Sequence, residues 1–390
     1  MSNHIVKAYQ SLPVSFTHGD GCYLWDSDGK RYLDALSGIS VTSLGHNFPA
    51  LTAALQEQVA TLLHTSNLYC IGWQQRLADL LCECAAMDRV FFANSGAEAN
   101  EAAIKLARLY GHQKGIDSPQ IVVMQQAFHG RTMATLSATG SRKVQAGFEP
   151  LVPGFVRSPF NDIASIEAIA ANNRDVVALL VEPVQGEAGI IIPDSGYLSA
   201  LRRICDENGW LLMLDEIQTG MGRSGKMFAC QHESVLPDVM TLAKALGNGV
   251  PIGACLTRGV AADVISPGNH GSTFGGNPLA CRAGYTVLRA MLDDNIAENA
   301  AQRGAQLAGL LREGLDALPQ FGEVRHLGLL LAIQMKLPCQ ALVSLALQQG
   351  LLINVTAESV IRLLPPLIID ETQTAEIADR LITCIHQFTD

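Results

Sequence analysis

The sequence of 390 residues has no cluster or stripe of lysine and arginine, and its formal net charge is −10 at pH 7. Proteins that bind nucleic acid usually neutralise backbone phosphates with such basic patches, so we expect no nucleic-acid partner. The sequence also lacks an apolar stretch of the ~20 residues that a bilayer crossing needs, and its first residues lack a basic segment followed by an apolar run. These absences predict a protein with no membrane partner, located in the cytoplasm.

Paired cysteines are absent as well. The ten cysteines are scattered singly, apart from Cys82 and Cys84, and none forms a CxxC pair that would indicate zinc or a redox dithiol. We therefore expect no metal site, and we interpret most cysteines as small apolar side chains in a reducing compartment.

Charged residues are few, at 16%, whereas hydrophobic residues make up 48% of the chain. This balance suits an α/β enzyme with much buried sheet and an extensive subunit interface, and it argues against disorder. The length exceeds what one compact core accommodates, so a large domain with a smaller companion is expected.

The middle of the chain, from about residue 90 to 280, alternates short apolar runs with helical segments. The runs that suit strands covered on both faces are residues 121–124, 176–181, 210–214 and 239–242. The segments with the length of crossover helices are residues 97–110, 163–172 and 198–207. This alternation predicts a mainly parallel sheet, whose ligands usually lie beyond the carboxyl ends of the strands.

The two ends of the chain have another pattern. Aromatic-rich runs at residues 21–26 and 28–34 surround an Asp-Gly turn and predict an antiparallel hairpin, which a helix with one apolar face follows at 49–63. Helices are expected at 296–317 and 372–388, and strands near 329–335, 351–354 and 360–364. This second α+β layer should be joined in space by the N-terminal hairpin.

A polar residue stands where one of the central apolar runs stops. Asp215 directly follows residues 210–214, so its carboxylate is predicted at the carboxyl edge of a buried strand. A buried carboxylate there would need a cationic or hydrogen-bonded partner. A helix-capping or loop aspartate is the alternative interpretation.

Lys244 follows a second apolar run, residues 239–243, in the same way. A lysine in apolar surroundings has a depressed pKa and becomes a nucleophilic amine that can condense with an aldehyde. The nearby Gly247, Gly249 and Gly253 would let the backbone approach a planar ligand. A lysine whose amine reaches the surface is the alternative.

A helix start provides a third feature. Ser95 fits the N-cap of an alanine-rich helix opened by Gly96 and Ala97. The free N–H groups and the positive dipole end of such a helix bind phosphate. Plain capping is the alternative, because every helix needs it.

Six segments of the sequence, in their order and spacing, resemble the class III (ornithine-type) aminotransferases. They are residues 94–101 (NSGAEANE), 128–131 (FHGR), 182–187 (EPVQGE), 215–220 (DEIQTG), Lys244 and 270–278 (HGSTFGGNP). The similarity runs from about Tyr9 to the C-terminus. It implies an α/β protein of fold type I, with a large domain whose mainly parallel sheet is flanked by helices, plus a smaller α+β domain. The implied division is 1–57 for the N-terminal part of the small domain, 58–285 for the large cofactor-binding domain and 286–390 for the C-terminal small domain.

The resemblance implies pyridoxal 5′-phosphate as the cofactor and a homodimer with shared active sites. Lys244 would carry the cofactor as a Schiff base and later move a proton, and Asp215 would keep the pyridine nitrogen protonated. The other implied cofactor contacts are Ser95, Gly96, Ala97, Phe128, Glu216, Ile217, Gln218 and, from the neighbouring subunit, Thr273. Ordinary core packing is the alternative for Phe128 and Ile217. Ala97 departs from the family, which commonly has threonine there.

The resemblance also implies anchors for two substrates that share one pocket. Arg131 would hold the α-carboxylate of N2-acetylornithine, with Ser272 of the partner subunit as a further contact. Arg362 would take the α-carboxylate of glutamate or 2-oxoglutarate, and Glu187 would neutralise Arg362 until that substrate arrives. The alternatives are a surface ion pair for Arg131 and a permanent salt bridge between Glu187 and Arg362.

The reaction that the resemblance implies transfers the δ-amino group of N2-acetylornithine to 2-oxoglutarate, giving N-acetylglutamate 5-semialdehyde and glutamate in arginine biosynthesis. The acylated donor is favoured by Ile39, because ornithine-specific members tend to have tyrosine there. Other donors of this family, namely succinylornithine, 4-aminobutyrate or N-succinyl-diaminopimelate, are the first alternative. An inactive regulatory protein that binds the cofactor without turnover is the second.

Overall fold

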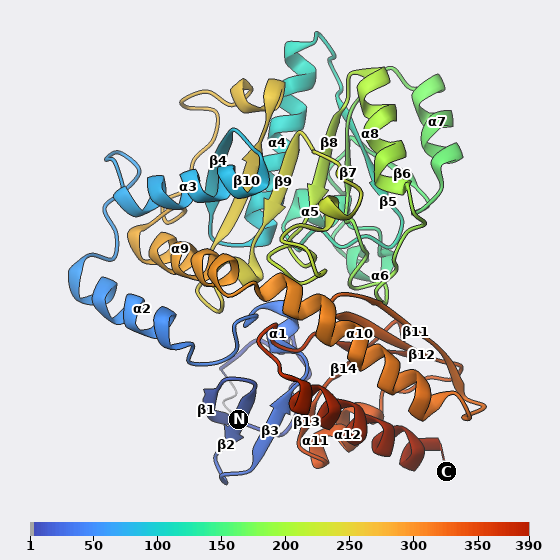
Figure 1. Ribbon diagram of the computed structural model, residues 1–390. Helices are drawn as coiled ribbons and strands as arrows, with labels where there is room; N and C mark the ends of the chain where they lie inside the picture. Colours follow the sequence, from blue (N-terminus) through green and yellow to red (C-terminus); the bar gives the residue numbers. More distant parts are fainter. Residues whose placement is uncertain (1–3, 390) are drawn as a thin grey trace.

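The computed structural model describes residues 4–389, and its centre is a seven-stranded sheet with the order β4-β10-β9-β8-β7-β5-β6 (Figure 1). The strands are β4 (Arg89–Ala93), β5 (Gln120–Met124), β6 (Phe155–Ser158), β7 (Val176–Val181), β8 (Leu211–Asp215), β9 (Val239–Leu242) and β10 (Gly253–Thr257). Strands β6, β5, β7, β8 and β9 pair in parallel, and β10 runs antiparallel to both β9 and β4. The predicted mainly parallel sheet is confirmed.

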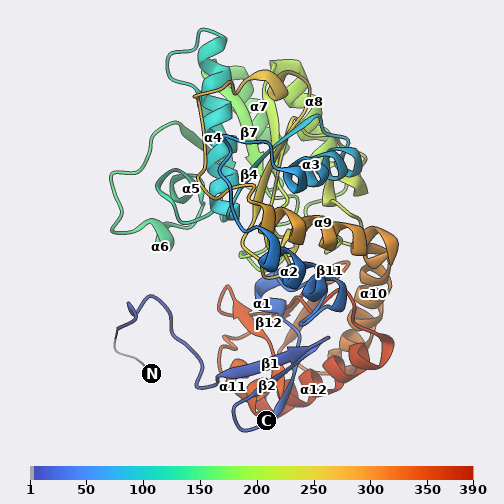
Figure 2. The same cartoon turned by 90° about the vertical axis from the view of Figure 1, so that its left-hand side faces the viewer.

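The central strands are apolar on both faces because helices cover both. Leu180 and Met213 pack in one cluster with α4 (Gly96–Gln113), and Leu179 and Leu212 pack in another with α8 (Tyr197–Asn208). Figure 2 shows α4 and α8 on opposite sides of this sheet. The other helices around it are α3 (Gly72–Ala85), α5 (Met133–Ala138), α6 (Arg142–Gln145), α7 (Ile163–Asn172), η1 (Ala229–His232), η2 (Lys244–Leu246) and η3 (Gly259–Asp263). The three predicted crossover helices correspond to α4, α7 and α8.

Two four-stranded sheets form the rest of the molecule, with the orders β1-β2-β3-β13 and β11-β12-β15-β14. Their strands are β1 (Phe16–Asp20), β2 (Tyr23–Asp26), β3 (Arg31–Asp34), β11 (Phe321–Leu327), β12 (Leu330–Met335), β13 (Leu351–Leu352), β14 (Asn354–Thr356) and β15 (Val360–Leu363). The helices beside them are α10 (Ile296–Leu315), α11 (Leu342–Gln348) and α12 (Glu371–Thr389). The N-terminal hairpin joins the C-terminal layer as predicted, because β3 pairs in parallel with β13.

This region differs from the prediction in three respects, because β11 and α11 were not expected and one expected strand is divided. The single strand expected at residues 351–354 is divided at the buried Ile353, so that β13 pairs with β3 and β14 pairs with β15. A short apolar run carries no signal that its two halves belong to different sheets.

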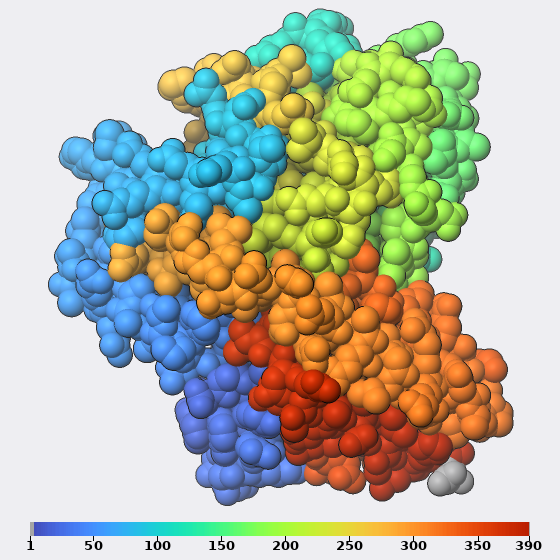
Figure 3. All heavy atoms as spheres, viewed as in Figure 1, coloured from blue at the N-terminus to red at the C-terminus, as the bar shows by residue number. Residues whose placement is uncertain are grey.

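The two parts of the molecule meet at α1 (Ser37–Ser40), α2 (Pro49–Thr61) and α9 (Pro278–Asp293). Figure 3 shows α9, in orange, in contact with the blue N-terminal helices beside it. The predicted domain boundaries at 57/58 and 285/286 fall inside α2 and α9, so the division into domains stays a prediction. Among residues 4–389, no helix combines the length and apolarity that a membrane span requires.

Candidate active site

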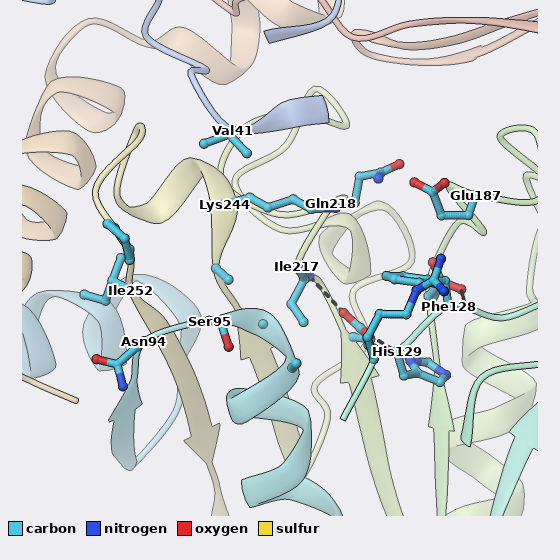
Figure 4. Close-up of a pocket in the computed structure, with 18 of the residues that line it drawn as sticks. Val41, Asn94, Ser95, Phe128, His129, Glu187, Ile217, Gln218, Lys244 and Ile252 are labelled. Atoms are coloured by element: carbon cyan, nitrogen blue, oxygen red, sulfur yellow. Dashed lines mark hydrogen bonds and ion pairs between the residues drawn. The ribbon is translucent and has the colours of Figure 1, made fainter. Parts of the chain in front are cut away.

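A cavity of about 450 Å³ lies beyond the carboxyl ends of β8 and β9 (Figure 4). This is the edge at which open parallel sheets usually bind ligands. The residues that line the cavity are Val41, Asn94, Ser95, Gly96, Ala97, Phe128, His129, Gly130, Arg131, Glu182, Glu187, Asp215, Ile217, Gln218, Ala243, Lys244, Gly249, Val250, Pro251 and Ile252. Most of the predicted site residues therefore come together in one place.

Lys244 enters the cavity directly after β9. Its backbone has a φ of 45°, in the left-handed region that residues other than glycine rarely adopt. Burial lowers the pKa of its amine, and the positive charge of Arg362 lowers it further, whereas Glu187 and Asp215 act in the opposite direction. The net effect is an amine that loses its proton more readily than an ordinary lysine.

Asp215 ends β8, and its side chain is only 4% exposed. Its Oδ2 accepts hydrogen bonds from His129 Nδ1 and Asn100 Nδ2, both at 2.8 Å. Its Oδ1 accepts from the backbone N–H of Ile217 at 3.1 Å. The buried carboxylate thus has the polar partners that its position demands, and the interpretation as a mere helix cap does not describe this arrangement.

Four residues of this site were given no role in the sequence analysis. His129, Asn100 and Glu182 lie within segments that resemble the family, but nothing in their spacing showed that His129 and Asn100 would converge on Asp215. Thr241, which donates to Asn100 Oδ1 at 2.8 Å, is hidden inside an apolar run. Glu182 is buried, which raises its pKa to about 7, and it accepts a hydrogen bond from the backbone N–H of Phe128 at 3.0 Å.

The start of α4 forms a close backbone cradle. Ser95 is the N-cap as predicted, since its Oγ accepts from the N–H of Glu98 at 3.2 Å. A Cβ added at Gly96 would meet Ile217 Cδ1 at 2.8 Å, and one added at Gly253 would meet the carbonyl oxygen of Ser95 at 2.2 Å. Backbone atoms leave no room for a side chain at Gly253, and a side chain at Gly96 would have to displace the end of Ile217.

Phe128 and Ile217 both line the cavity, so at least part of each side chain is available to a ligand. Gln218 lies beside the loop that bears Glu187, because a Cβ at Gly186 would meet Gln218 Oε1 at 1.9 Å. Figure 4 shows Lys244 and Gln218 extending into the same space. Arg131 is exposed at the cavity rim, with its Cζ 5.8 Å from the centre of the Phe128 ring.

Arg362 and Glu187 form an ion pair, with 2.6 Å between Nη1 and Oε1. Arg362 is 1% exposed and is held from behind by Asn354 Oδ1 at 3.1 Å and the carbonyl of Gly186 at 3.2 Å. The side chain of Glu187 is 38% exposed. Burial alone would raise its pKa, but the charge and hydrogen bond of Arg362 hold that pKa below its ordinary value. Glu187 lines the cavity whereas Arg362 lies behind it, so the glutamate separates the guanidinium from a ligand.

Besides Arg362, three predicted residues do not line this cavity. Glu216 accepts hydrogen bonds from Thr219 Oγ1 at 2.6 Å and from the N–H of Ala229 and Cys230 at 2.9 Å, so its carboxylate stabilises a neighbouring loop. Ser272 and Thr273 line a different hollow with Glu98 and His270. Within one chain, the structure therefore does not bring Glu216, Ser272 or Thr273 to the cavity that holds Lys244 and Asp215.

The chain matches the family described as aminotransferase class-III over residues 5–385. It is 54% identical to the acetylornithine aminotransferase of Nitrosomonas europaea over 386 residues, which cover 99% of this chain and 98% of that protein. It is 49% identical to the acetylornithine aminotransferase of Gloeobacter violaceus over 377 residues, which cover 96% of this chain and 93% of that protein.

Solved structures give the same picture. The ornithine aminotransferase from Toxoplasma gondii superposes with a TM-score of 0.96 at 34% identity, covering 99% of this chain and 93% of that one. The acetylornithine aminotransferase from Elizabethkingia anophelis has a TM-score of 0.89 at 35% identity, covering 99% of this chain and 97% of that one.

Proposed function

The chain belongs to the class III aminotransferase family, and we propose that it transfers the δ-amino group of N2-acetylornithine to 2-oxoglutarate. The products are N-acetylglutamate 5-semialdehyde and glutamate. This reaction is a step of arginine biosynthesis, and we assign it to the cytoplasm. The observation that carries transamination is the meeting of Lys244 and Asp215 in one cavity at the ends of neighbouring strands. The acylated donor is supported by the relatives that are named acetylornithine aminotransferase and match almost the whole chain.

Pyridoxal 5′-phosphate is the cofactor of this family, and the residues of the cavity fit it. When bound, it supplies a positively charged ring that accepts the electrons released as the substrate carbon loses a proton. The amine of Lys244 would hold it covalently, and Asp215 would face the ring nitrogen. The backbone at Ser95, Gly96 and Ala97 would bind the phosphate at the start of α4. Backbone N–H groups serve there even though Ala97 offers no hydroxyl.

The chain's own groups then supply the proton transfer and the polarity of the site. Because the pKa of Lys244 is lowered, its Nζ can take a proton from the substrate carbon and release it again later in the reaction. Asn100 and His129 orient the Asp215 carboxylate, which favours positive charge beside it. Phe128 and Ile217 would cover the two faces of the ring and exclude water, with Gln218 near its hydroxyl group.

Two chemically different substrates require an adjustable cavity. N2-acetylornithine presents its δ-amino end without a nearby carboxylate, so Glu187 can stay on Arg362 while Arg131 at the rim takes the distant α-carboxylate. In glutamate and 2-oxoglutarate a carboxylate adjoins the reacting carbon. We propose that Glu187 then moves aside, because a bidentate Arg362–carboxylate pair replaces the ion pair seen within the chain.

A homodimer is part of the same proposal. Thr273 and Ser272 lie outside the cavity of their own chain, and Asn67 ties that loop to the segment before α3 through the carbonyls of Ser272 and Gly275. Large apolar side chains are exposed in these two segments, namely Leu62, Leu63, Leu68, Tyr69 and Phe274. Such a patch needs a covering partner, and a second copy would bring Thr273 and Ser272 of the partner subunit to this cavity. The N-terminal arm extends away from the rest of the chain in Figure 2 and exposes apolar side chains, so it too is suited to contact a second copy.

The deciding experiment is a donor comparison with the purified protein, added cofactor and 2-oxoglutarate as acceptor. We expect the highest kcat/KM with N2-acetylornithine, compared with succinylornithine, ornithine, 4-aminobutyrate and N-succinyl-diaminopimelate. A clear preference for 4-aminobutyrate contradicts the proposed donor. Bound cofactor without turnover of any amine would instead favour a regulatory protein.

A further inference from the structure

Arg223 is completely buried, yet among residues 4–389 no carboxylate lies within ion-pair distance of its guanidinium. A buried charge without a counter-ion is costly unless hydrogen bonds satisfy it. Here all of its partners are uncharged oxygens from distant parts of the chain. Burial lowers the pKa of Arg223 to about 9, and only the more distant charge of Asp34 opposes that shift. A guanidinium that is buried at this free-energy cost is expected to have a specific role in the fold or the site.

The first two partners lie on the segment that carries one wall of the cavity. Arg223 Nε donates to Ser40 Oγ at 3.0 Å, and Nη2 donates to Ser43 Oγ at 3.1 Å. Val41, which lines the cavity, stands between these two serines. Arg223 therefore holds the wall residue from both sides.

That segment needs outside support, because its backbone is strained. Ser37, Ile39 and Ser40 have φ values of 52°, 68° and 62°, all in the left-handed region. Each such residue costs of order 1 kcal/mol or more and persists only where surrounding contacts hold it. The hydrogen bonds from Arg223 are contacts of that kind, and Ser40 Oγ in turn reaches the carbonyl of Gln218 at 3.5 Å.

The other two partners lie at the ends of two paired strands, since Pro365 follows β15, which carries Arg362, and Leu329 precedes β12. Arg223 Nη1 donates to the carbonyl of Pro365, three residues beyond Arg362, at 2.5 Å and to that of Leu329 at 3.2 Å. Leu329 returns a hydrogen bond from its N–H to the carbonyl of Arg223 at 3.0 Å. Leu329 leads into β12, where Ala332 pairs with Arg362.

The turn before β12 also approaches the Arg223 loop closely. Gly328 has a φ of +56°, and a Cβ added to it would meet Gly225 N and the carbonyl carbon of Ser224, both at 2.4 Å. The two backbones are therefore in direct contact, which leaves no room for the turn to shift independently.

We propose that Arg223 is a positioning residue that fixes the cavity wall at Val41 relative to Arg362 and so determines how well the cavity accepts the dicarboxylate. The guanidinium is suited to this because its planar fork donates in several fixed directions at once, whereas a lysine amine cannot reach the same four oxygens in that geometry. The inference rests on the proposed function, in which only the dicarboxylate uses Arg362. N2-acetylornithine is anchored instead at Arg131, to which Arg223 makes no hydrogen bond.

The test compares Arg223→Lys and the double variant Ser40→Ala/Ser43→Ala with wild type. We expect the KM for 2-oxoglutarate to rise roughly tenfold in the first and about threefold in the second, since hydrogen bonds to a charged group are lost. In both, the KM for N2-acetylornithine and kcat should stay within about twofold of wild type. Ser224→Ala is the matched control, because Ser224 is buried in the same loop and its Oγ has no hydrogen-bond partner among the described residues.

Hydrogen exchange of the amides at residues 37–44 gives a second readout that does not depend on turnover. It should become faster in both test variants and not in Ser224→Ala. Equal KM increases for both substrates, or no change for 2-oxoglutarate, overturn the proposal. If Arg223→Lys does not fold, the double serine variant decides alone.

Failure of the proposed donor is separable from failure of this inference. The half-reaction with glutamate also requires Arg362 and can be followed by the absorbance of the bound cofactor. A wild-type protein that ignores N2-acetylornithine but reacts with glutamate rejects the donor. In that case the KM for glutamate is compared with the KM for the best ω-amine in the same variants, and a selective increase for glutamate supports the role of Arg223.

Discussion

The two ends of the cavity are built differently. At one end, Lys244 and Asp215 follow neighbouring strands of the large sheet, whose backbones pair directly, and Asp215 is fixed by three hydrogen bonds. At the other end, the ion pair between Glu187 and Arg362 joins a loop to β15, and Glu187 is 38% exposed. In the proposed function, the groups assigned to the chemistry are thus held by several contacts, whereas recognition of the second substrate is assigned to an ion pair whose glutamate is partly exposed.

The largest effect is expected at the end that holds Lys244 and Asp215. Lys244→Ala removes the amine that is proposed to hold the cofactor and to transfer the proton, so turnover should fall by on the order of 10³-fold or more. Steady-state kinetics and the absorbance of bound cofactor measure this loss. Lys226→Ala, an exposed lysine outside the cavity, is the control and should behave as wild type. Retained activity in Lys244→Ala would contradict the role proposed for Lys244 in the chemical step.

A smaller loss is expected from Asp215→Asn, which keeps the shape of the side chain but removes its charge and replaces one of its two accepting oxygens by a donating amide group. We expect kcat to fall roughly 10²-fold with both substrates, because charge stabilisation at the ring is lost. Asp238→Asn, at a carboxylate near the opposite end of the strands, controls for general effects on the sheet. A change in KM without a change in kcat would argue against a role for Asp215 in the chemical step.

The end that holds Glu187 and Arg362 should respond selectively. Arg362→Met removes the proposed anchor of the dicarboxylate. The kcat/KM of the half-reaction with 2-oxoglutarate or glutamate should therefore fall about 10²-fold, as expected for a lost charge-assisted pair. The half-reaction with N2-acetylornithine should change by only a few-fold, since that substrate is assigned to Arg131. Equal losses in both half-reactions would mean that the two ends of the cavity do not divide the work in this way.

The smallest effect is expected from Glu187→Gln. This change leaves Arg362 without its neutralising partner, so the half-reaction with N2-acetylornithine should slow about tenfold while that with glutamate is unchanged or improved. Thermal unfolding distinguishes the alternative of a permanent structural salt bridge. That alternative predicts a lower Tm and similar losses with both substrates.

The end that holds Lys244 and Asp215 was also the part most accessible to prediction from the sequence. Buried parallel strands appear as continuous apolar runs, and the residue that follows each run must lie at the same edge, which brought Asp215 and Lys244 together. Glu216 directly follows β8 and its N–H still bonds to the carbonyl of Thr241 at 3.0 Å, so the alternation of side chains along an extended chain turns it away from the side of Asp215. The contact of Asp215 with Asn100 and His129, by contrast, depends on how α4, which carries Asn100, and the loop that carries His129 pack against β8, and no periodicity describes that packing.

The junction between the sheets was less predictable for the same reason. Arg223 contacts residues 180 and 183 positions earlier and 106 and 142 positions later in the chain. The division of residues 351–354 between two sheets likewise follows from the packing around Ile353. Neither feature has a local sequence signal, since both arise from chain segments that meet only in the folded protein.

The most direct test of the central claim locates the cofactor on the chain. The protein is incubated with pyridoxal 5′-phosphate, reduced with borohydride, digested and analysed by mass spectrometry. We expect the phosphopyridoxyl group on the peptide that contains Lys244, together with loss of transamination from N2-acetylornithine. Modification of another lysine with Lys244 left free, or no modification in an active protein, would contradict the account.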